Sequence, residues 1–510
     1  MLARTARILK LVAQLVAVSA LTFLAVRAFD AHQSAPLALW HTFVPSEMVA
    51  EELDEADWEA YLVREQTLFD EVRSEVTDKL EPEERILSNR YFEGSPLYPG
   101  RFARDWNRSY VLEPDGEPRG AVVLLHGLTD SPYSLRHIGR HYRASGYVVI
   151  GIRLPGHGTV PAGLTTVHWE DWSAATRLAV REAVRRVGPS APLQLVGFSN
   201  GGALAMKYVL DAVEDPSMRQ ADRVILITPM IGITEMARFA GFAGLPAIFP
   251  AFASAAWLGV IPEFNPFKYN SFPVNGARQS SLLTRALQPR IARYARHGRL
   301  DELPPIITFQ SVVDFTVSTR AIVTSLYAQL PDNGSELVLF DINRNTKFGP
   351  LMRPGTETAL ERLLPPTPRT FKTTVITNAD PESSEVVERV TEAGETTERV
   401  RALGLNYPRD VFSLSHVALP FPIDDSLYGL EPNENEDFGA HLGALAIHGE
   451  RGLLVMSLDS LVRLSWNPFY SYLLDRIEEG IADAPVGKTG DGATGKADAA
   501  QGIDDPESRS

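Results

Sequence analysis

A serine flanked by glycines, at the end of an apolar run, is the feature of this sequence with the clearest chemical meaning. The run LQLV leads into residues 197–202 (GFSNGG), after which the chain has helix-forming residues. A sharp turn from strand to helix needs glycine at Gly197 and Gly201, because side chains there would meet the backbone of the turn. The turn would expose the Ser199 hydroxyl, with the N–H of Asn200 aimed at a developing oxyanion. The spacing predicts a nucleophilic serine, and the alternative is a glycine-rich turn without chemistry.

A serine hydroxyl is a weak nucleophile, so it needs a neighbouring base and an acid that orients the base. In this kind of sheet the partners follow in the order serine, acid, histidine, in loops after late strands. Asp314 follows the apolar run 305–310, and His416 follows the last predicted strand. Asp314 would accept a hydrogen bond from one ring nitrogen of His416. His416 would take the Ser199 proton and later return it to the leaving group.

Both assignments have structural alternatives. Asp314 could cap the helix that follows it, and His416 could be a loop histidine with satisfied hydrogen bonds. Asp301 precedes its strand, and Asp341 lies where the sheet is expected to end. The competing histidines lie nearer the last helix: His441 and His448.

The pair His126-Gly127 ends an early buried run and predicts the second half of an oxyanion hole. Gly127 allows the chain to turn tightly, and the N–H of Leu128 would join that of Asn200 as a donor. One such donor is typically worth about 2.7–4 kcal/mol in the transition state. His126 is expected to support the loop rather than react, and we expect the same of His157 in the sequence PGHG.

The elements that must position these residues alternate between strand and helix. Strands are expected at residues 106–112, 121–125, 147–152, 193–196, 223–228, 305–310 and 336–340. The first two are expected to form a hairpin. The alternation predicts the α/β class, with a mostly parallel, doubly wound sheet.

Composition changes along the chain predict its organisation. An apolar, aromatic-rich segment breaks the alternation and is expected to be a helical cap over the sheet, the alternative being an ordinary packed helical layer. The expected units are an N-terminal anchor or signal segment (1–32), a helical extension (45–95), the core (96–230 and 301–482), the cap (231–300, with a helix at 236–242), an acidic insertion within the core (342–405) and a disordered tail (484–510).

The N-terminal segment predicts a membrane anchor. An uncharged run, residues 11–26, lies between Lys10 and Arg27 and follows a basic flank. The run is short for a bilayer span, but both flanking side chains can extend to the interface. We expect the N-terminus in the cytoplasm and the catalytic domain outside, in the periplasm or at the cell surface. The alternative is a signal peptide that is cleaved on secretion.

The net charge, the lack of cysteine and the lack of certain motifs exclude several classes of function. The formal charge is 49 − 64 = −15, which disfavours nucleic acid as a partner because no basic stripe appears. The chain has no cysteine, which excludes disulfides, zinc–thiolate sites and a cysteine nucleophile. No metal-binding, P-loop or dinucleotide motif appears. We therefore expect neither a metal nor a cofactor.

Five motifs in order carry a family resemblance. They are LLHGLTDSPYS (124–134), RLPGHG (153–158), VGFSNGG (196–202), VVDFTV (312–317) and SLSHVALPF (413–421). The chain resembles the α/β-hydrolase superfamily, within it the serine hydrolases that include monoacylglycerol lipases, lysophospholipases and carboxylesterases.

The resemblance implies hydrolysis of carboxylic esters through an acyl-enzyme, without a cofactor. It implies the triad Ser199, Asp314 and His416, oxyanion amides at Leu128 and Asn200, and a lid formed by the cap. Many relatives carry Met or Gln where this chain has Asn200, which changes only a side chain. The long segment between the acid and the base is a second departure.

The leading hypothesis is a membrane-anchored serine hydrolase acting on a lipid-like or medium-chain acyl ester. An acyltransferase would use the same triad with a different acceptor. A non-catalytic binding protein of this fold is the third reading, although relatives of that kind usually lack the serine or the histidine. Dehalogenases and epoxide hydrolases carry Asp at the turn, where this chain has Ser199. No oligomeric state follows from the sequence.

Overall fold

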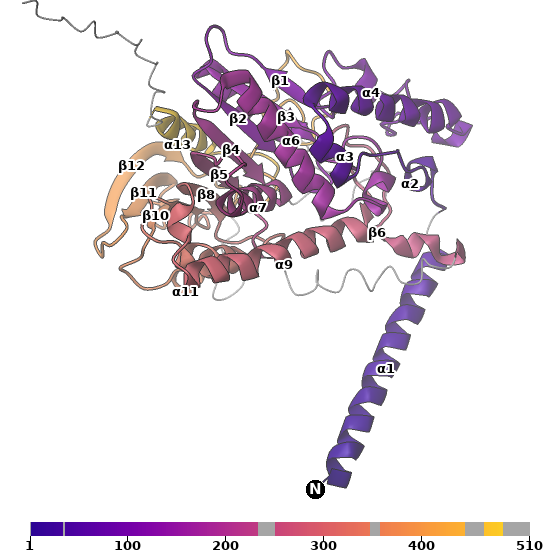
Figure 1. Ribbon diagram of the computed structural model, residues 1–510, viewed down its shortest axis with the longest axis horizontal. Coiled ribbons are helices and arrows are strands. Elements are labelled where there is room, and N and C mark those ends of the chain that lie inside the picture. Colours follow the sequence, from indigo (N-terminus) through magenta and orange to yellow (C-terminus); the bar gives the residue numbers. More distant parts are fainter. Residues whose placement is uncertain (1, 34–35, 233–249, 347–357, 444–463, 483–510) are drawn as a thin grey trace, which may run out of the picture.

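The computed structural model describes residues 2–33, 36–232, 250–346, 358–443 and 464–482 (Figure 1). The expected helix at 236–242, the expected disordered tail and His448 lie outside these residues.

The core of the protein is one ten-stranded sheet with the order β1-β3-β2-β4-β5-β8-β9-β10-β11-β12. Neighbours from β3 through β10 run parallel, whereas β1, β11 and β12 pair antiparallel. The strands are β1 (Tyr110–Leu112), β2 (Gly120–Leu125), β3 (Tyr147–Ile152), β4 (Leu193–Phe198), β5 (Arg223–Ile227), β8 (Ile306–Ser311), β9 (Glu336–Phe340), β10 (Lys372–Asn378), β11 (Glu385–Thr391) and β12 (Arg399–Asn406). The expected mostly parallel α/β sheet is confirmed.

The central strands are almost entirely apolar because both of their faces are covered. In β2, Val123 and Leu125 pack into the core on one face, and Val122 and Leu124 pack into the core on the other. Successive side chains of a strand point to opposite faces, so a continuous apolar run contributes to both cores.

Helices cover both faces of this sheet (Figure 1). The long helices α6 (Trp169–Val187), α7 (Asn200–Glu214) and α9 (Val274–Arg296) contribute to one core. Helices α5 (Arg136–Ala144) and α13 (Tyr470–Ala482) contribute to the other. The remaining described α-helices and the short cap strands are α1 (Leu2–Gln33), α2 (Leu39–Thr42), α3 (Ala50–Glu55), α4 (Trp58–Glu75), α10 (Thr319–Ser325), α11 (Ala359–Leu363), β6 (Trp257–Gly259) and β7 (Phe272–Pro273).

The expected hairpin between residues 106–112 and 121–125 is wrong. β1 pairs antiparallel with β3, not with β2, and Tyr110 lies opposite Gly151. A Cβ at Gly151 would lie 2.4 Å from the Tyr110 ring. The ring packs where β3 has no side chain, and this long-range contact is not visible in the local turn sequence.

The segment expected as an acidic insertion extends the sheet. After β9 the chain forms β10, which pairs parallel with β9, and then β11 and β12, which add antiparallel strands. The expectation that the sheet ends near Asp341 is therefore wrong. The outer strand β12 is mostly exposed, so its sequence lacks the apolar pattern by which the inner strands are recognised.

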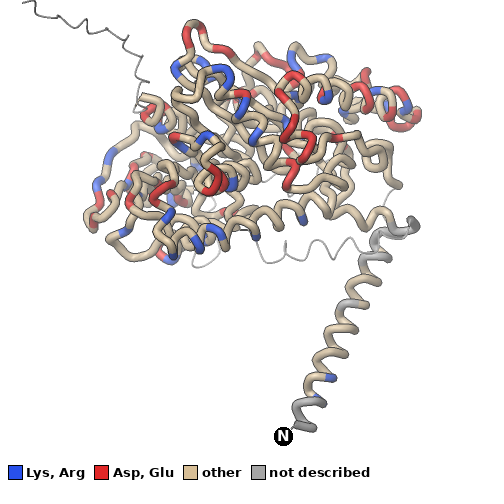
Figure 2. The backbone as a smooth tube through the Cα atoms, viewed as in Figure 1, with Lys and Arg blue, Asp and Glu red and all other residues tan. Residues whose placement is uncertain are grey.

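The N-terminal extension packs onto the body through α3 and α4. Leu53, Trp58 and Tyr61 are buried in the same core as α6, and the Asp57 carboxylate caps α4 by accepting from the Ala60 N–H. Acidic residues are frequent along this segment (Figure 2), and Glu51, Glu52, Asp54 and Glu55 are exposed.

Helix α1 extends away from the body (Figure 1). Its segment Arg7–Val26 has a mean hydropathy of 2.1 and is not buried. By length and composition it could cross a membrane, and an N-terminal signal sequence has the same features.

Candidate active site

The turn between β4 and α7 holds Ser199 in a backbone conformation that few residues adopt. Ser199 has φ 54° and ψ −113°. A Cβ on Gly197 would lie 2.4 Å from the Gly201 carbonyl oxygen, and one on Gly201 would lie 1.9 Å from the Leu125 oxygen. Glycine is required at both positions because backbone meets backbone there. At Gly201, the first turn of α7 therefore packs directly against the end of β2.

Backbone hydrogen bonds hold Ser199 in this strained turn. Its N–H donates to the Ile227 carbonyl at 3.0 Å, and its own carbonyl accepts from Met230 at 2.9 Å and Gly202 at 3.0 Å. Strain of this kind persists only where surrounding contacts enforce it, and it is common at reactive residues.

The structure brings Ser199, His416 and Asp314 into one hydrogen-bonded line. The Ser199 Oγ lies 2.9 Å from His416 Nε2, and His416 Nδ1 lies 2.9 Å from Asp314 Oδ2. Ser199 is 5% exposed and His416 is 4% exposed. Since an ionised carboxylate only accepts, Nδ1 carries a proton and Nε2 is free to accept the serine proton. The arrangement can therefore generate a nucleophilic serine.

Asp314 is held from both of its oxygens. Oδ1 accepts from the N–H groups of Thr316 at 2.7 Å and Val317 at 3.0 Å, and Oδ2 accepts from Gln310 Nε2 at 3.2 Å as well as from His416. Burial raises the pKa of Asp314. The hydrogen bond and charge of His416, together with the two N–H groups, outweigh burial and leave this pKa below its usual value. The carboxylate is thus ionised at neutral pH and can stabilise an imidazolium.

The loop after β2 lies directly against Ser199. A Cβ on Gly127 would lie 3.3 Å from the Ser199 Cβ. Among the described residues, no acceptor takes the N–H of Leu128 or that of Asn200. Asn200 opens helix α7, so the helix dipole adds positive potential at this point. Free N–H groups beside a nucleophile can stabilise an oxyanion.

His126 supports this loop and has no nitrogen left for catalysis. Its Nε2 accepts from the Leu154 N–H at 3.0 Å, so Nδ1 carries the proton and donates to the Gly127 carbonyl at 2.9 Å. Burial, and then the neighbouring His157, hold the pKa of His126 well below its usual value. Burial likewise lowers the pKa of His157 to about 3. Both rings are therefore neutral.

The alternative candidates for the acid and the base make contacts elsewhere in the structure. The Asp341 carboxylate accepts from Thr377 and pairs with Arg344. Nδ1 of His441 contacts the Ser426 carbonyl at 3.1 Å, and Asp301 lies in a short helical turn before β8.

Two residues at the site were missed by the sequence analysis. Gln310 holds Asp314, and a polar residue near the end of an otherwise apolar strand was the available signal. Ser280 on α9 donates to the Asn200 Oδ1 at 3.0 Å. Nothing in the local sequence around Ser280 indicates that α9 reaches the turn.

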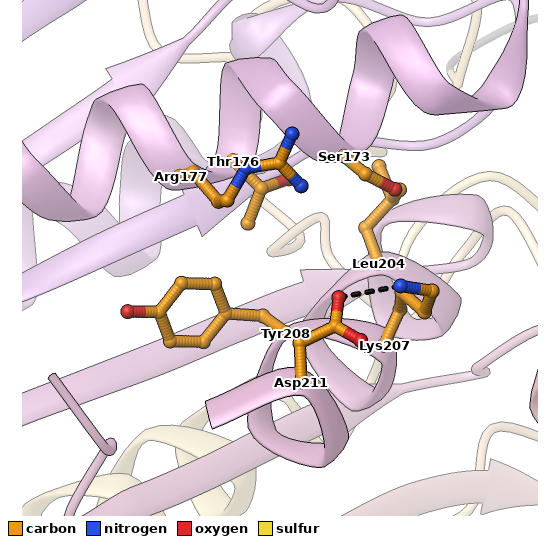
Figure 3. Close-up of a pocket in the computed structure, with 7 residues that line it drawn as sticks. All are labelled: Ser173, Thr176, Arg177, Leu204, Lys207, Tyr208 and Asp211. Carbon is orange, nitrogen blue, oxygen red and sulfur yellow. Dashed lines mark hydrogen bonds and ion pairs between the residues drawn. The ribbon is translucent and has the colours of Figure 1, made fainter. Parts of the chain in front are cut away.

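A small crevice lies between α6 and α7 (Figure 3). Its lining comes entirely from those two helices: Ser173, Thr176, Arg177, Leu204, Lys207, Tyr208 and Asp211. Lys207 and Asp211 form an ion pair within it. No triad residue lines the crevice, so we assign it no part in the chemistry.

Within the described ranges, no three His, Asp or Glu side chains gather in a way that could hold a metal ion.

Residues 116–324 match the family described as Hydrolase_4, serine aminopeptidase, S33. The chain is 32% identical over 104 residues to a monoacylglycerol lipase of Mycolicibacterium smegmatis, covering 19% of this chain and 35% of that protein. It is 32% identical over 85 residues to a thermostable monoacylglycerol lipase of a Bacillus species, covering 17% of this chain and 33% of the relative. The matched stretch thus spans about a third of each curated relative.

Solved structures of lipolytic enzymes are also similar. A structure from work on LipS and LipT, two metagenome-derived lipolytic enzymes, is 20% identical with a TM-score of 0.36, covering 51% of this chain and 97% of that one. A soluble variant of monoglyceride lipase from Saccharomyces cerevisiae is 14% identical with a TM-score of 0.36, covering 45% of this chain and 81% of that one.

Proposed function

Because residues 116–324 match the Hydrolase_4 (S33) family, we propose that this chain is a serine hydrolase of that family and that it cleaves carboxylic esters of lipid-like or medium-chain acyl groups. Ser199 is the nucleophile, His416 the general base and acid, and Asp314 the orienting acid. The observation that carries the proposal is the pair of 2.9 Å contacts that join these three side chains.

Acylation begins when the Ser199 Oγ attacks the ester carbonyl carbon and its proton passes to His416 Nε2. The carbonyl oxygen becomes an oxyanion, which accepts from the N–H groups of Leu128 and Asn200. The imidazolium is stabilised by Asp314. As the C–O bond to the alcohol breaks, His416 donates its proton to the leaving alkoxide, and the acyl group remains esterified to Ser199.

Deacylation repeats these steps with water. His416 takes a proton from water while the water oxygen attacks the acyl carbon, and the same two N–H groups stabilise the second oxyanion. When the bond to Ser199 breaks, the proton returns to the Ser199 Oγ and the carboxylic acid is released. If an alcohol took the place of water, the product would be a new ester.

Two observations support an acyl ester as the substrate. The curated relatives are monoacylglycerol lipases. The described part of the cap also places an apolar side chain, Phe272, near Leu128, because a Cβ at Gly276 of α9 would lie 3.7 Å from Phe272 and 3.8 Å from Leu128. Apolar side chains beside Leu128 suit an alkyl chain better than a charged group.

We also propose that α1 anchors the enzyme in a membrane, with the catalytic domain on the extracytoplasmic side. The apolar segment Arg7–Val26 and its basic N-terminal flank support this orientation. Extraction of the full chain from membranes by detergent but not by high salt or carbonate would agree with an anchor. A soluble protein lacking the first residues would instead indicate a cleaved signal.

Hydrolysis by the purified full chain in detergent tests the proposed activity. The substrates are a p-nitrophenyl ester series of increasing acyl length, a monoacylglycerol and an amino-acid p-nitroanilide. We expect turnover of the first two, with a maximum at medium or long acyl chains, and loss of turnover in Ser199→Ala. Exclusive cleavage of the anilide would contradict the ester assignment. Transfer of the acyl group to glycerol in preference to water would indicate an acyltransferase.

A further inference from the structure

Arg153, in the loop after β3, is fully buried and is neutralised by the N-terminal extension. Its guanidinium donates to both oxygens of Glu47, at 2.8 and 3.0 Å, and to Glu65 Oε1 at 3.1 Å. It also donates to the His157 carbonyl at 3.0 Å. Both carboxylates precede residues 116–324, the part of the chain that matches the family.

The same two carboxylates hold the backbone around Arg153. Glu47 Oε1 accepts from the Gly156 N–H at 2.9 Å. Glu65 accepts from the Ser109 N–H and hydroxyl, and the Ser109 Oγ accepts from the Arg153 N–H at 2.8 Å. The loop is therefore fixed by side chains of the extension at its charged group and along its backbone.

This loop in turn fixes His126. The Leu154 N–H donates to His126 Nε2, and His126 Nδ1 donates to the Gly127 carbonyl. The Gly127 carbonyl and the Leu128 N–H belong to one planar peptide group and point in opposite directions. A hydrogen bond that orients this carbonyl therefore orients the Leu128 N–H.

We infer that Glu47 and Glu65 are positioning residues for the oxyanion hole. Through Arg153, Leu154 and His126, the N-terminal extension sets the direction of the Leu128 N–H. The inference rests on the proposed function, in which this N–H stabilises the oxyanion. It gives the extension a role in the transition state rather than in substrate binding.

A purely structural role for the extension makes a different prediction, and the chain offers a matched control. Asp54 of α3 pairs with Arg177 of α6 through two contacts of 2.7 and 2.6 Å. This pair also fastens the extension to the body, but it touches neither the loop at 153–157 nor His126. Asp54→Asn should change stability without changing catalysis.

The experiment compares the full-length wild type with Glu47→Gln, Asp54→Asn, His126→Ala and the Glu47→Gln/His126→Ala double variant. The readouts are kcat and KM on a p-nitrophenyl ester and the rate constant of labelling by a fluorophosphonate, at a temperature where circular dichroism shows each variant folded. We expect Glu47→Gln to lower kcat and the labelling rate by about 10- to 100-fold. A displacement of a catalytic group by about 1 Å can lower the rate by about 10²-fold. KM should change by less than about twofold, because substrate binding is not involved.

The double variant separates positioning from general damage. If Glu47 acts through His126, Glu47→Gln should slow the His126→Ala enzyme no further. Glu47→Asp keeps the charge beside Arg153, so it provides a folded variant if Glu47→Gln does not fold. Its shorter carboxylate should still lower kcat by several fold, whereas Asp54→Asn should remain within about twofold of wild type.

Equal kcat for Glu47→Asp, Asp54→Asn and wild type would overturn the inference, as would independent, multiplying effects of Glu47→Gln and His126→Ala. In both cases a wild type that is labelled and hydrolyses esters leaves the proposed function standing. A folded wild type that neither labels nor hydrolyses would overturn the proposed function and this inference together.

Discussion

The two halves of the site are built in different ways. The turn at Ser199 is held by backbone packed against backbone, with glycines that leave no room for a Cβ. The acid–base half, which consists of Asp314 and His416, is held by side-chain hydrogen bonds. His416 lies 102 residues beyond Asp314 in the sequence. The first half is a local structure that the motif specifies. The second exists only once the whole sheet has folded.

This difference predicts two kinds of damage. A change in the turn should act through sterics, because the atoms there cannot separate without moving β2 or α7. A change in the acid–base half should leave the fold intact and act on proton transfer. The four predictions that follow test this distinction, in order of decreasing effect on activity and then on stability.

Asp314→Asn should give the largest loss with the fold retained. An amide at this position can favour the wrong tautomer of His416, and we expect kcat to fall by about 10⁴-fold. Steady-state kinetics with circular dichroism would measure this. A fall in kcat that matched a loss of folded protein would contradict a chemical role for Asp314.

Gly201→Ala should distort the turn at Ser199 by a steric clash. The new Cβ would lie 1.9 Å from the Leu125 oxygen, so the first turn of α7 and the Asn200 N–H must move. We expect kcat to fall by about 10²–10³-fold, the effect of losing one oxyanion donor, together with a lower melting temperature.

Gly276→Ala is the matched control for that variant. A Cβ there would meet its nearest atoms at 3.7 Å, an ordinary contact, and alanine is favoured over glycine within a helix by roughly 0.5–1 kcal/mol. Its stability should be unchanged or higher. If Gly201→Ala were equally well tolerated, the turn would not be held as we describe.

Gln310→Leu should lower kcat by less than Asp314→Asn or Gly201→Ala does, because it removes only one of the hydrogen bonds that hold Asp314. That hydrogen bond is worth about 1.5–3 kcal/mol for a charged acceptor, but two N–H donors remain. We expect kcat to fall by about tenfold. Thr319→Val, which removes a different partner of Gln310, should leave kcat nearly unchanged, and equal losses in the two variants would argue against a direct effect on Asp314.

His157→Asn should change the pH dependence of stability rather than activity. Burial lowers the pKa of His157 in the folded protein to about 3, against about 6.5 when unfolded. Between these values the unfolded state binds more protons, so wild-type stability falls as the pH falls from about 6.5 towards 3. The variant should lose stability less steeply, by up to about 1.4 kcal/mol per pH unit. Urea unfolding across this range would show it, and parallel slopes would contradict the burial of a neutral ring.

What the sequence predicts well is what neighbouring residues determine. The strands β3 and β9 begin and end at the residues expected from their apolar runs. Ser199 and its two glycines are likewise specified within a few residues. The order of the three candidate residues along the chain pointed to Asp314 and His416, because such sheets place their loops in a fixed order, and the structure brings both side chains into one hydrogen-bonded line with Ser199.

What the sequence could not predict depends on contacts between distant residues. Tyr110 packs over Gly151, which places β1 beside β3 and rules out the expected hairpin. The mostly exposed outer strand β12 carries few of the apolar signals that identify a buried strand. The pairing of Glu47 with Arg153 joins residues 106 positions apart, and only the folded chain brings them together.

Labelling with a fluorophosphonate, followed by mass spectrometry of the modified peptide, tests the central claim most directly. The claim is that His416 and Asp314 make Ser199 a nucleophile. We predict that the folded wild type is labelled on Ser199, and that Ser199→Ala and His416→Ala are not labelled at a comparable rate. A folded, detergent-solubilised wild type that stays unlabelled, or that is labelled on another serine, would contradict it.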